Sequence, residues 1–267
     1  MLPLATLLCA LLAVSAGLLL GWRIAARPRL WPPVALAAVA FVALWLYAHY
    51  LTDWPCRFVP WRDWCFFERV PLVFSIFVIL GICLRSLQDR RLLRVALATI
   101  AVLFAAHSVL DIGSPLIFRS ALAALDSDAA GRGPVSQTTG WSCSAAAGAT
   151  FLRLHAIPAS ERQVAELAGT SPLTGTDDLG LCRAIEILGE PRGLRPRLRA
   201  GLGQADLPTL RRPCLFGYRL SFTVWHTAVL VSSQGDRLEV EDPLLGRDTW
   251  TREDFLRKWV GTAVELE

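Results

Sequence analysis

The chain has 267 residues, of which 54% are hydrophobic and 19% are charged, and its mean hydropathy is positive, at +0.43. This composition is too apolar for an ordinary soluble protein and indicates that part of the chain lies in lipid. The formal net charge of +4 comes from arginine, with Lys258 as the single lysine, and no basic run is interleaved with aromatic residues, so nucleic-acid binding is not expected.

Four apolar runs occupy the N-terminal part of the chain, and each approaches the ~20 residues that a helix needs to cross the hydrocarbon core of a bilayer. They are Leu2–Gly21, Trp31–Tyr50, Val70–Leu84 and Leu92–Ile112, the third reaching spanning length if Phe66 and Phe67 join it. The first could instead be a signal peptide. It lacks a basic N-terminal region and a convincing small-x-small cleavage site, so we expect a membrane span there as well.

The placement of arginine predicts how these spans are oriented. The first connection holds Arg23, Arg27 and Arg29 without an acid, and the third holds four arginines with one acid, Asp89. In the second connection, residues 51–69, three arginines are balanced by acids. Because cytoplasmic connections carry an excess of Lys and Arg, we expect connections one and three in the cytoplasm. The N-terminus and everything after the fourth span are then extracytoplasmic.

We expect three parts: a transmembrane four-helix region at 1–113, a connector and linker at 114–133, and a second domain at 134–267. Ser114–Asp128 stays apolar with Arg119 inside it, which is too short and polar to span a bilayer. It is predicted to lie along the membrane surface as an amphipathic connector. Asp126–Gly133 is predicted to be a short flexible linker.

The second domain is predicted to begin with helices and to continue with strands. Ser160 and Gln163 form a capping box that starts a short helix, and Leu179, Cys182 and Ile185 recur at helical spacing in the next one. Helices are predicted at 143–155, 160–169, 176–189 and 251–259, and strands at 214–220, 224–232 and 237–241.

The cysteines suggest up to two disulfides. Cys56 and Cys65 lie in the predicted outer loop, and an oxidising compartment would let them pair. Cys182 and Cys214 are either a second pair or two buried thiols, since two cysteines in one domain need not meet. Cys9 and Cys83 lie in predicted spans and are interpreted as small apolar residues, so if both pairs form, Cys143 is the odd cysteine.

Cys143 follows a Gly/Pro-containing segment and begins an Ala-rich run, so it is predicted at the first turn of a helix. The positive end of the helix dipole favours the thiolate there, which is the nucleophilic form. Gln137 could turn back and place its side-chain NH2 beside the Cys143 backbone N–H, and two such donors make an oxyanion hole.

His226 and Asp242 are the candidate base and orienting acid, since one hairpin separates them and adjacent antiparallel strands place residues side by side. Each has a structural alternative. A lone histidine among apolar strand residues is more often structural, and Asp-Pro is a common turn pair. In combination with Gln137 and Cys143, the catalytic interpretation is favoured.

These motifs together resemble a known family. Gln137-x5-Cys143, then Trp225-His226-Thr-Ala-Val, then Glu241-Asp242-Pro-Leu-Leu-Gly246 are similar to the papain-like cysteine peptidases of the bacteriocin-processing family, which cut double-glycine leader peptides. The resemblance covers about 134–267. This chain has Ser144-Ala145 where the family usually has Gly-Pro or Gly-x after the cysteine.

The resemblance implies a papain-like α+β fold and a role for each candidate residue. Cys143 would be the nucleophile, His226 the base, Asp242 the group that orients the base, and Gln137 an oxyanion donor. It implies no cofactor and no metal.

The membrane half holds a second group of ionisable residues near the predicted outer leaflet, namely His49, Asp53, Glu68, His107 and Asp111. Ionisable groups at such depth are functional candidates, and these types can ligate a metal. The alternative, which we favour, is an interfacial polar cluster that is paired with Arg69 or solvated.

The sequence therefore predicts an α-helical transmembrane bundle of four spans followed by an α+β papain-like cysteine peptidase domain. We expect a multi-pass protein of the cell (inner) membrane with an extracytoplasmic catalytic domain, acting on a peptide or protein substrate. A partner exporter is left open, because the chain has no G-x-x-x-x-G-K-[ST] motif. The alternatives are an inactive peptide-binding module, favoured by the missing glycine after Cys143, and another acyl-transfer activity of the amidase or transglutaminase kind.

Overall fold

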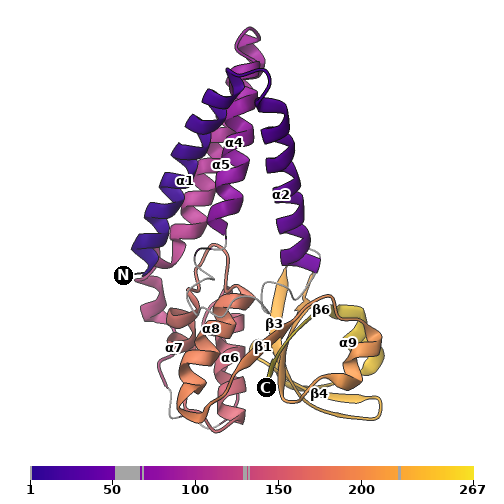
Figure 1. Ribbon diagram of the computed structural model, residues 1–267. Coiled ribbons are helices and arrows are strands. Elements are labelled where there is room, and N and C mark those ends of the chain that lie inside the picture. Colours follow the sequence, from indigo (N-terminus) through magenta and orange to yellow (C-terminus); the bar gives the residue numbers. More distant parts are fainter. Residues whose placement is uncertain (1, 52–66, 68, 129–130, 132, 222–223) are drawn as a thin grey trace. The chain divides into compact units, whose positions relative to one another are not determined.

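The computed structural model describes residues 2–51, 67, 69–128, 131, 133–221 and 224–267 (Figure 1). The chain divides into two compact units. One comprises Met1–His49 and Asp63–Ile117 and is called the helical unit here; the other comprises Tyr50–Arg62 and Phe118–Glu267 and is called the mixed unit.

The helical unit contains the four predicted spans. They are α1 (Leu2–Ala25), α2 (Trp31–Leu51), α4 (Arg69–Ser86) and α5 (Arg91–Ile117). All four are long and apolar enough to cross a membrane. α5 continues through Pro115 to Ile117, so the first residues of the predicted connector belong to this helix.

Three glycines, Gly17, Gly21 and Gly81, form a seam of small residues that lets α1 and α4 approach closely. The sequence analysis did not predict this contact. Gly17 and Gly21 lie one turn apart on α1, and a Cβ at Gly21 would lie 2.1 Å from the carbonyl oxygen of Val78. A Cβ at Gly81 on α4 would lie 2.5 Å from the carbonyl oxygen of Leu18. Helices in lipid associate through such small residues because their backbones can then make close van der Waals contact.

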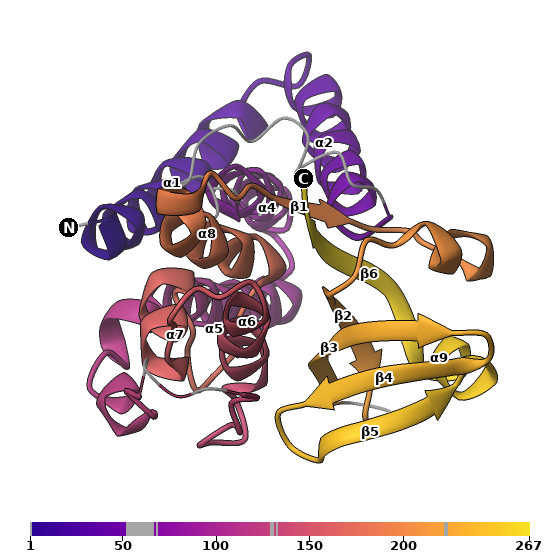
Figure 2. The same ribbon diagram turned by 90° about the horizontal axis from the view of Figure 1, so that it is seen from below.

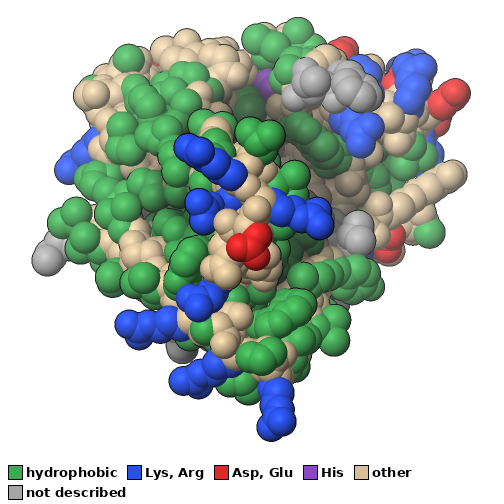
Figure 3. Space-filling model, turned by 90° about the horizontal axis from the view of Figure 1, so that it is seen from above, with side chains coloured by type: hydrophobic (Ala, Val, Ile, Leu, Met, Phe, Trp, Pro, Cys, Tyr) green, Lys and Arg blue, Asp and Glu red, His purple; other side chains and the backbone are tan. Residues whose placement is uncertain are grey.

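Arginines mark the turns at one end of the helical unit. The α1–α2 and α4–α5 turns both lie at this end, and Figure 3 looks onto it, where basic side chains stand out among hydrophobic ones. The Arg85 guanidinium lies 5.4 Å from the centre of the Trp22 ring. A cation over an indole is the kind of group found at a membrane–water interface. Which side of the membrane this end faces stays a prediction.

The mixed unit begins with three helices that match the predicted ones. They are α6 (Cys143–Leu154), α7 (Glu161–Ala168) and α8 (Asp178–Gly189). The capping box at the start of α7 is confirmed, because the Ser160 hydroxyl accepts from the Gln163 N–H and the Gln163 side chain accepts from the Ser160 N–H. α6 is packed tightly: a Cβ at Gly148 would lie 2.8 Å from Leu181 Cδ1.

A six-stranded antiparallel sheet completes this unit, in the order β1-β6-β2-β3-β4-β5. Figure 2 shows α6, α7 and α8 grouped beside it. The strands are β1 (Pro196–Arg199), β2 (Cys214–Arg219), β3 (Trp225–Gln234), β4 (Arg237–Asp242), β5 (Gly246–Thr251) and β6 (Trp259–Leu266). The sequence predicted β2, β3 and β4, and the closing helix as α9 (Arg252–Lys258), but not β1, β5 or β6.

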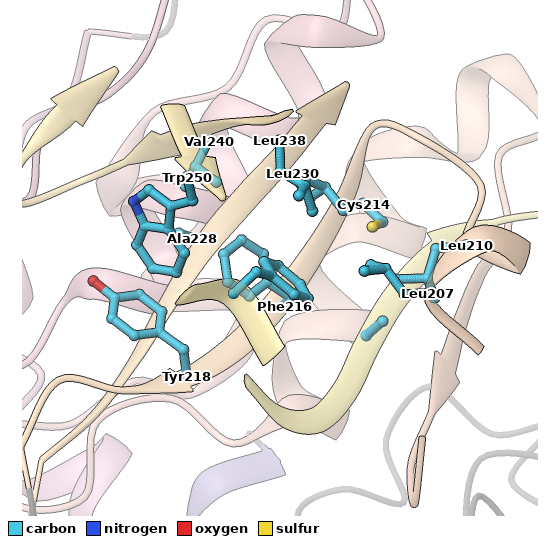
Figure 4. Packing of buried hydrophobic residues seen from close by; sticks show 12 residues of the cluster. Leu207, Leu210, Cys214, Phe216, Tyr218, Ala228, Leu230, Leu238, Val240 and Trp250 are labelled. Carbon is cyan, nitrogen blue, oxygen red and sulfur yellow. The ribbon is translucent and has the colours of Figure 1, made fainter. Parts of the chain in front are cut away.

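One face of the sheet holds an aromatic-rich core (Figure 4). Phe216, Tyr218, Trp250 and Phe255 pack there, with Phe216 and Phe255 ring centres 4.8 Å apart. Residues along β2 alternate between faces, so Phe216 and Tyr218 point into this core while Leu215 and Gly217 lie toward α8. One face of the sheet thus packs on the aromatic core, and the other lies toward α8.

This alternation corrects one expectation. Cys214 lies on the same face as Phe216, wholly buried against Leu207 and Leu210 (Figure 4), whereas Cys182 lies on α8 beyond the other face. The disulfide between Cys182 and Cys214 is therefore not formed, and both residues remain thiols. The predicted pair of Cys56 and Cys65 lies outside the described residues.

After Ile117 the connector continues with a turn and the short 3-10 helix η2 (Ala121–Ala124). Its position along the membrane surface stays a prediction. The described part of the linker is hydrogen-bonded: Arg162 donates to the carbonyl of Leu125, and the Asp126 N–H donates to Glu161 Oε2 at 3.2 Å. Two further 3-10 turns, η3 (Glu190–Arg192) and η4 (Gln204–Thr209), flank β1.

The fold class predicted from the sequence is confirmed. Four long apolar helices precede a unit in which a short helical layer with a cysteine at the start of one helix adjoins an antiparallel sheet with a histidine at the start of one strand. That division into a helical and a sheet half is the arrangement of a papain-like fold.

Candidate active site

Cys143 is the first residue of α6 and is partly buried. The residue before it, Ser142, is wholly buried and closes the preceding turn, since its hydroxyl donates to the Thr139 carbonyl and accepts from the Thr139 N–H, both at 3.1 Å. This turn fixes where the helix starts. The sulfur is consequently held at the positive end of the α6 dipole, as predicted.

His226 and Asp242 meet across the β3–β4 pair. Val229 is opposite Glu241 in the register, so Asp242 lies diagonally across from His226, within reach of a long side chain. His226 Nε2 lies 3.1 Å from Asp242 Oδ1, and both side chains are buried. The predicted contact between these two residues is present.

Asp242 accepts further hydrogen bonds. Its Oδ2 accepts from the buried hydroxyl of Tyr218, and its Oδ1 accepts from the backbone N–H groups of Leu244 and Leu245 at 2.8 and 3.0 Å. Burial alone would raise the pKa of this carboxyl, but the bonds from His226, Tyr218 and the Leu244 amide outweigh it and lower the pKa to about 2. Asp242 is therefore an anion at neutral pH.

The carboxylate in turn acts on the imidazole. Burial would lower the pKa of His226, but the bonded Asp242 carboxylate and the Cys143 sulfur raise it to about 9. The Tyr218 ring meets the imidazole edge-on, with the two ring centres 5.2 Å apart. Because Nε2 contacts the carboxylate, Nδ1 is the nitrogen left for the sulfur.

The Cys143 thiol responds to that neighbour. Burial would raise its pKa, but hydrogen bonding and charge from His226, the Thr227 backbone and the Ser144 hydroxyl together hold it below its ordinary value. A lowered thiol pKa beside a raised imidazole pKa favours a thiolate–imidazolium pair. This is the protonation state in which a cysteine is a ready nucleophile.

Gln137 is tied to the turn that follows Asp242. Its backbone N–H donates to the Pro243 carbonyl at 2.9 Å, which joins the segment before the cysteine to the end of β4. Its side-chain Nε2 donates to the Thr139 carbonyl at 2.9 Å. One N–H of that amide thus orients it, while its Oε1 is buried without a hydrogen-bond partner among the described residues.

Glu161 also holds the segment that contains Gln137 in place, a role that the sequence analysis did not predict. Its carboxylate is wholly buried at the start of α7 and accepts from the Thr138 N–H at 2.8 Å and from the Thr138 hydroxyl. It thereby holds the residue next to Gln137. Glutamate at the first helical turn is also favoured by the helix dipole, so its sequence signal was indistinguishable from ordinary capping.

The second candidate group, in the helical unit, is only partly described. Asp53, Glu68 and the side chain of His49 lie outside the described residues. Arg69 Nη1 lies 2.7 Å from Asp111 Oδ2, which is the ion pair anticipated by the interfacial interpretation. Among the residues that the structure describes, no three His, Cys, Asp or Glu side chains gather as metal ligands would.

The site and fold define a class: a thiol at the start of a helix faces a histidine and carboxylate from a sheet, as in papain-like peptidases. No family model matches the chain. It is 35% identical over 135 residues to an uncharacterized protein of Methanothermobacter marburgensis, covering 50% of this chain and 87% of that protein. The chain belongs to the family of this archaeal protein.

The chain is also similar to two proteins that are named as proteases. Over 135 residues the chain is 33% identical to the probable functional amyloid protease FapD of Pseudomonas aeruginosa, covering 48% of this chain and 57% of that one. A solved double glycine motif protease from a transporter, in complex with its leader peptide, has a TM-score of 0.45 and 20% identity, covering 53% of this chain and 95% of that one. Both of these proteins carry the name of a protease.

Proposed function

We propose that this chain is a membrane-anchored cysteine peptidase that cuts peptide bonds of exported peptides or proteins outside the cytoplasm. The observation that carries the proposal is the buried His226–Asp242 pair, which lies near enough to Cys143 that the imidazole and the sulfur shift each other's pKa. Nucleophilic catalysis by cysteine requires a base beside the nucleophile and an acidic group that orients the base, and Cys143, His226 and Asp242 would fill these three roles.

In the proposed reaction the Cys143 thiolate attacks the scissile carbonyl carbon, and the carbonyl electron pair moves onto oxygen. The Cys143 backbone N–H, freed at the first turn of α6, and the Gln137 side-chain amide stabilise that oxyanion. The His226 imidazolium then gives its proton to the leaving amine as the C–N bond breaks. Water, deprotonated by His226, hydrolyses the thioester, and the sulfur leaves as a thiolate, which restores the thiolate–imidazolium pair.

Asp242 does not take up a proton in this scheme. With a pKa of about 2 it remains ionised, and it stabilises the imidazolium while fixing the ring so that Nδ1 faces sulfur. Tyr218 and the amides of Leu244 and Leu245 keep the carboxylate in place.

The substrate we propose is an exported peptide with a small-residue site such as Gly-Gly. The matched transporter domain is solved with a leader peptide, and the relative from Pseudomonas is a protease, and both support a peptide substrate. The arginine bias of the α1–α2 and α4–α5 turns supports an extracytoplasmic site.

Site-resolved thiol alkylation tests the proposal. Full-length protein in proteoliposomes is treated with iodoacetamide across pH, and the modification of each cysteine is followed by mass spectrometry. We expect one fast cysteine, Cys143, that slows at least tenfold in His226→Ala, whereas Cys182→Ala leaves it unchanged. Cys214 will stay unreactive because burial raises its pKa to about 12. Uniformly slow thiols would instead favour a binding module.

Comparison of cells that carry the wild type or Cys143→Ala then identifies the reaction. Mass spectrometry of secreted peptides should reveal species with new termini only in the wild type. Amine incorporation without new termini would instead indicate a transferase. An impermeant maleimide that labels Cys143 in intact spheroplasts would support the extracytoplasmic position, and labelling only after lysis would exclude it.

A further inference from the structure

Ser144 stands where the resembling family usually has glycine, and the structure gives its hydroxyl a partner. Ser144 Oγ lies 2.8 Å from Thr227 Oγ1. Ser144 directly follows Cys143 on α6, and Thr227 directly follows His226 on β3. The bond therefore joins the two elements that carry the sulfur and the imidazole, at the residues next to each.

The side chain of Thr227 is available for this contact because of strand alternation. Thr227 pairs with Gly217 and His226 pairs with Tyr218, so the imidazole lies on the core face of β3 while the hydroxyl lies on the face toward α6. The Thr227 backbone also lowers the pKa of the Cys143 thiol. Thr227 thus acts on both Cys143 and Ser144.

Ser144 also reaches the sulfur itself. Its Oγ lies 3.9 Å from Cys143 Sγ, within the range of a weak O–H···S contact, and Ser144 is only 7% exposed. If Thr227 donates to Ser144 Oγ, the Ser144 hydrogen is left to point at sulfur. Such a bond is stronger to a thiolate than to a neutral thiol, because the charged sulfur is the better acceptor, so it favours the ionised form.

Resting on the proposed function, we infer that Ser144 and Thr227 form a hydrogen-bonded clasp that holds the nucleophile helix against the base strand and directs a hydroxyl donor at the thiolate. Both are positioning residues, since they act through Cys143 and His226. At the position where a glycine is expected after the cysteine, this chain thus has a serine that hydrogen-bonds α6 to β3.

The test measures the pH midpoint of Cys143 alkylation in the full-length protein. Ser144→Ala and Thr227→Val should each raise the midpoint by about half a unit to one unit, which is about a 3- to 10-fold loss of rate below the midpoint. Thr227→Ser should restore the wild-type midpoint because it keeps the hydroxyl. The double variant should lose no more than the larger single loss, because both changes break one bond.

Thr150→Val is the matched control. Thr150 is a buried hydroxyl on the same helix, accepts from the Val135 N–H at 2.8 Å, and belongs to no part of the proposed site. Its loss should lower the melting temperature without moving the midpoint. If Ser144→Ala and Thr227→Val behave in that way, Ser144 and Thr227 only stabilise the fold and the clasp is wrong.

The outcomes separate the clasp from the proposed function. If His226→Ala raises the midpoint and the clasp variants do not, only the clasp fails. If the clasp variants shift the midpoint but the wild type cuts no peptide in the secretome comparison, the clasp stands and the peptidase assignment falls. If no variant moves the midpoint, both are overturned.

Discussion

Asp242→Asn is the substitution that most directly probes the site. Asparagine keeps the size of the side chain and an oxygen that can accept from Tyr218 or the Leu244 amide, but it removes the negative charge beside His226. An amide NH2 that faces Nε2 would also favour the wrong tautomer of the imidazole. The change therefore separates the turn-forming use of Asp242 from its electrostatic use.

The size of the effect follows from the raised pKa of His226. That pKa is about 9 against an ordinary value of 6.5, and both Asp242 and the Cys143 sulfur raise it. If Asp242 supplies about half of the difference, its loss lowers the pKa of the imidazolium by about one unit, or roughly 1.4 kcal/mol. Above pH 9 the protonated fraction of His226, and with it the thiolate–imidazolium pair, then becomes about tenfold smaller, and tautomer disorder lowers turnover further.

The assay is alkylation of Cys143 between pH 5 and pH 10, followed together with peptide cleavage. For the wild type, the imidazolium limb of the profile, where the rate falls as His226 loses its proton, should lie near pH 9, because the raised pKa of His226 keeps the proton bound until that pH is reached. For Asp242→Asn this limb should move toward lower pH, and the acid limb, where the thiolate forms, toward higher pH. The window in which both charged groups coexist should therefore narrow from both sides.

Glu241→Gln is the charge-matched control. Glu241 precedes Asp242 on β4 and pairs with Arg247 instead of the imidazole. Its replacement by glutamine removes one negative charge, as Asp242→Asn does. Its alkylation profile should match the wild type. An Asp242→Asn profile that also matches the wild type would refute the role of the carboxylate, and equal narrowing in both variants would reduce that role to a general effect of net charge.

Three further outcomes are expected. Gln137→Ala should lower cleavage about 10²–10³-fold with an unchanged alkylation profile, since an oxyanion donor acts on the intermediate and not on the thiol; a shifted profile would contradict this role. Tyr218→Phe should raise the pKa of Asp242 from about 2 toward its ordinary 3.8. A carboxyl whose pKa is lower in the folded than in the unfolded state stabilises the fold above its unfolded-state pKa, and this stability is lost as the pH falls through its folded-state pKa. Acid unfolding of Tyr218→Phe, followed by circular dichroism, should therefore move to higher pH. An unchanged transition would exclude a stabilising bond between Tyr218 and Asp242. Gly21→Leu should lower the thermal stability of the helices in detergent, because a Cβ there would lie 2.1 Å from a backbone carbonyl, whereas Leu19→Ala, at an exposed position, should not; equal effects would argue against the seam.

The sequence was sufficient where the physical signal is local. The capping box at Ser160, the four apolar runs and the strand that carries His226 depend on neighbours within one turn or one strand, and the structure contains all of them. β1 and β6 illustrate the opposite case. β1 is four residues long and includes two arginines, and its place is set by pairing with β6 from the far end of the chain. No window of sequence contains that information.

The partners of the site residues were hidden for the same reason. Tyr218 is one of several aromatic residues in a strand pattern, and only the β2–β3 register places its hydroxyl at Asp242. Cys214 and Cys182 were similarly plausible as a pair until strand alternation sent Cys214 to the face away from α8. In each case the deciding quantity is which face of the sheet a residue occupies relative to a distant element.

Asp242 shows why a structural and a functional interpretation of one residue need not compete. The Asp-Pro turn is real, since Asp242 Oδ1 accepts from the amides of Leu244 and Leu245. The Leu244 amide also helps to lower the pKa of the carboxyl, and both amides fix the oxygen that faces His226. The turn is thus part of what keeps the carboxylate charged and aimed. A residue with an ordinary local role is suited to orienting a base because its position is already determined by the backbone around it.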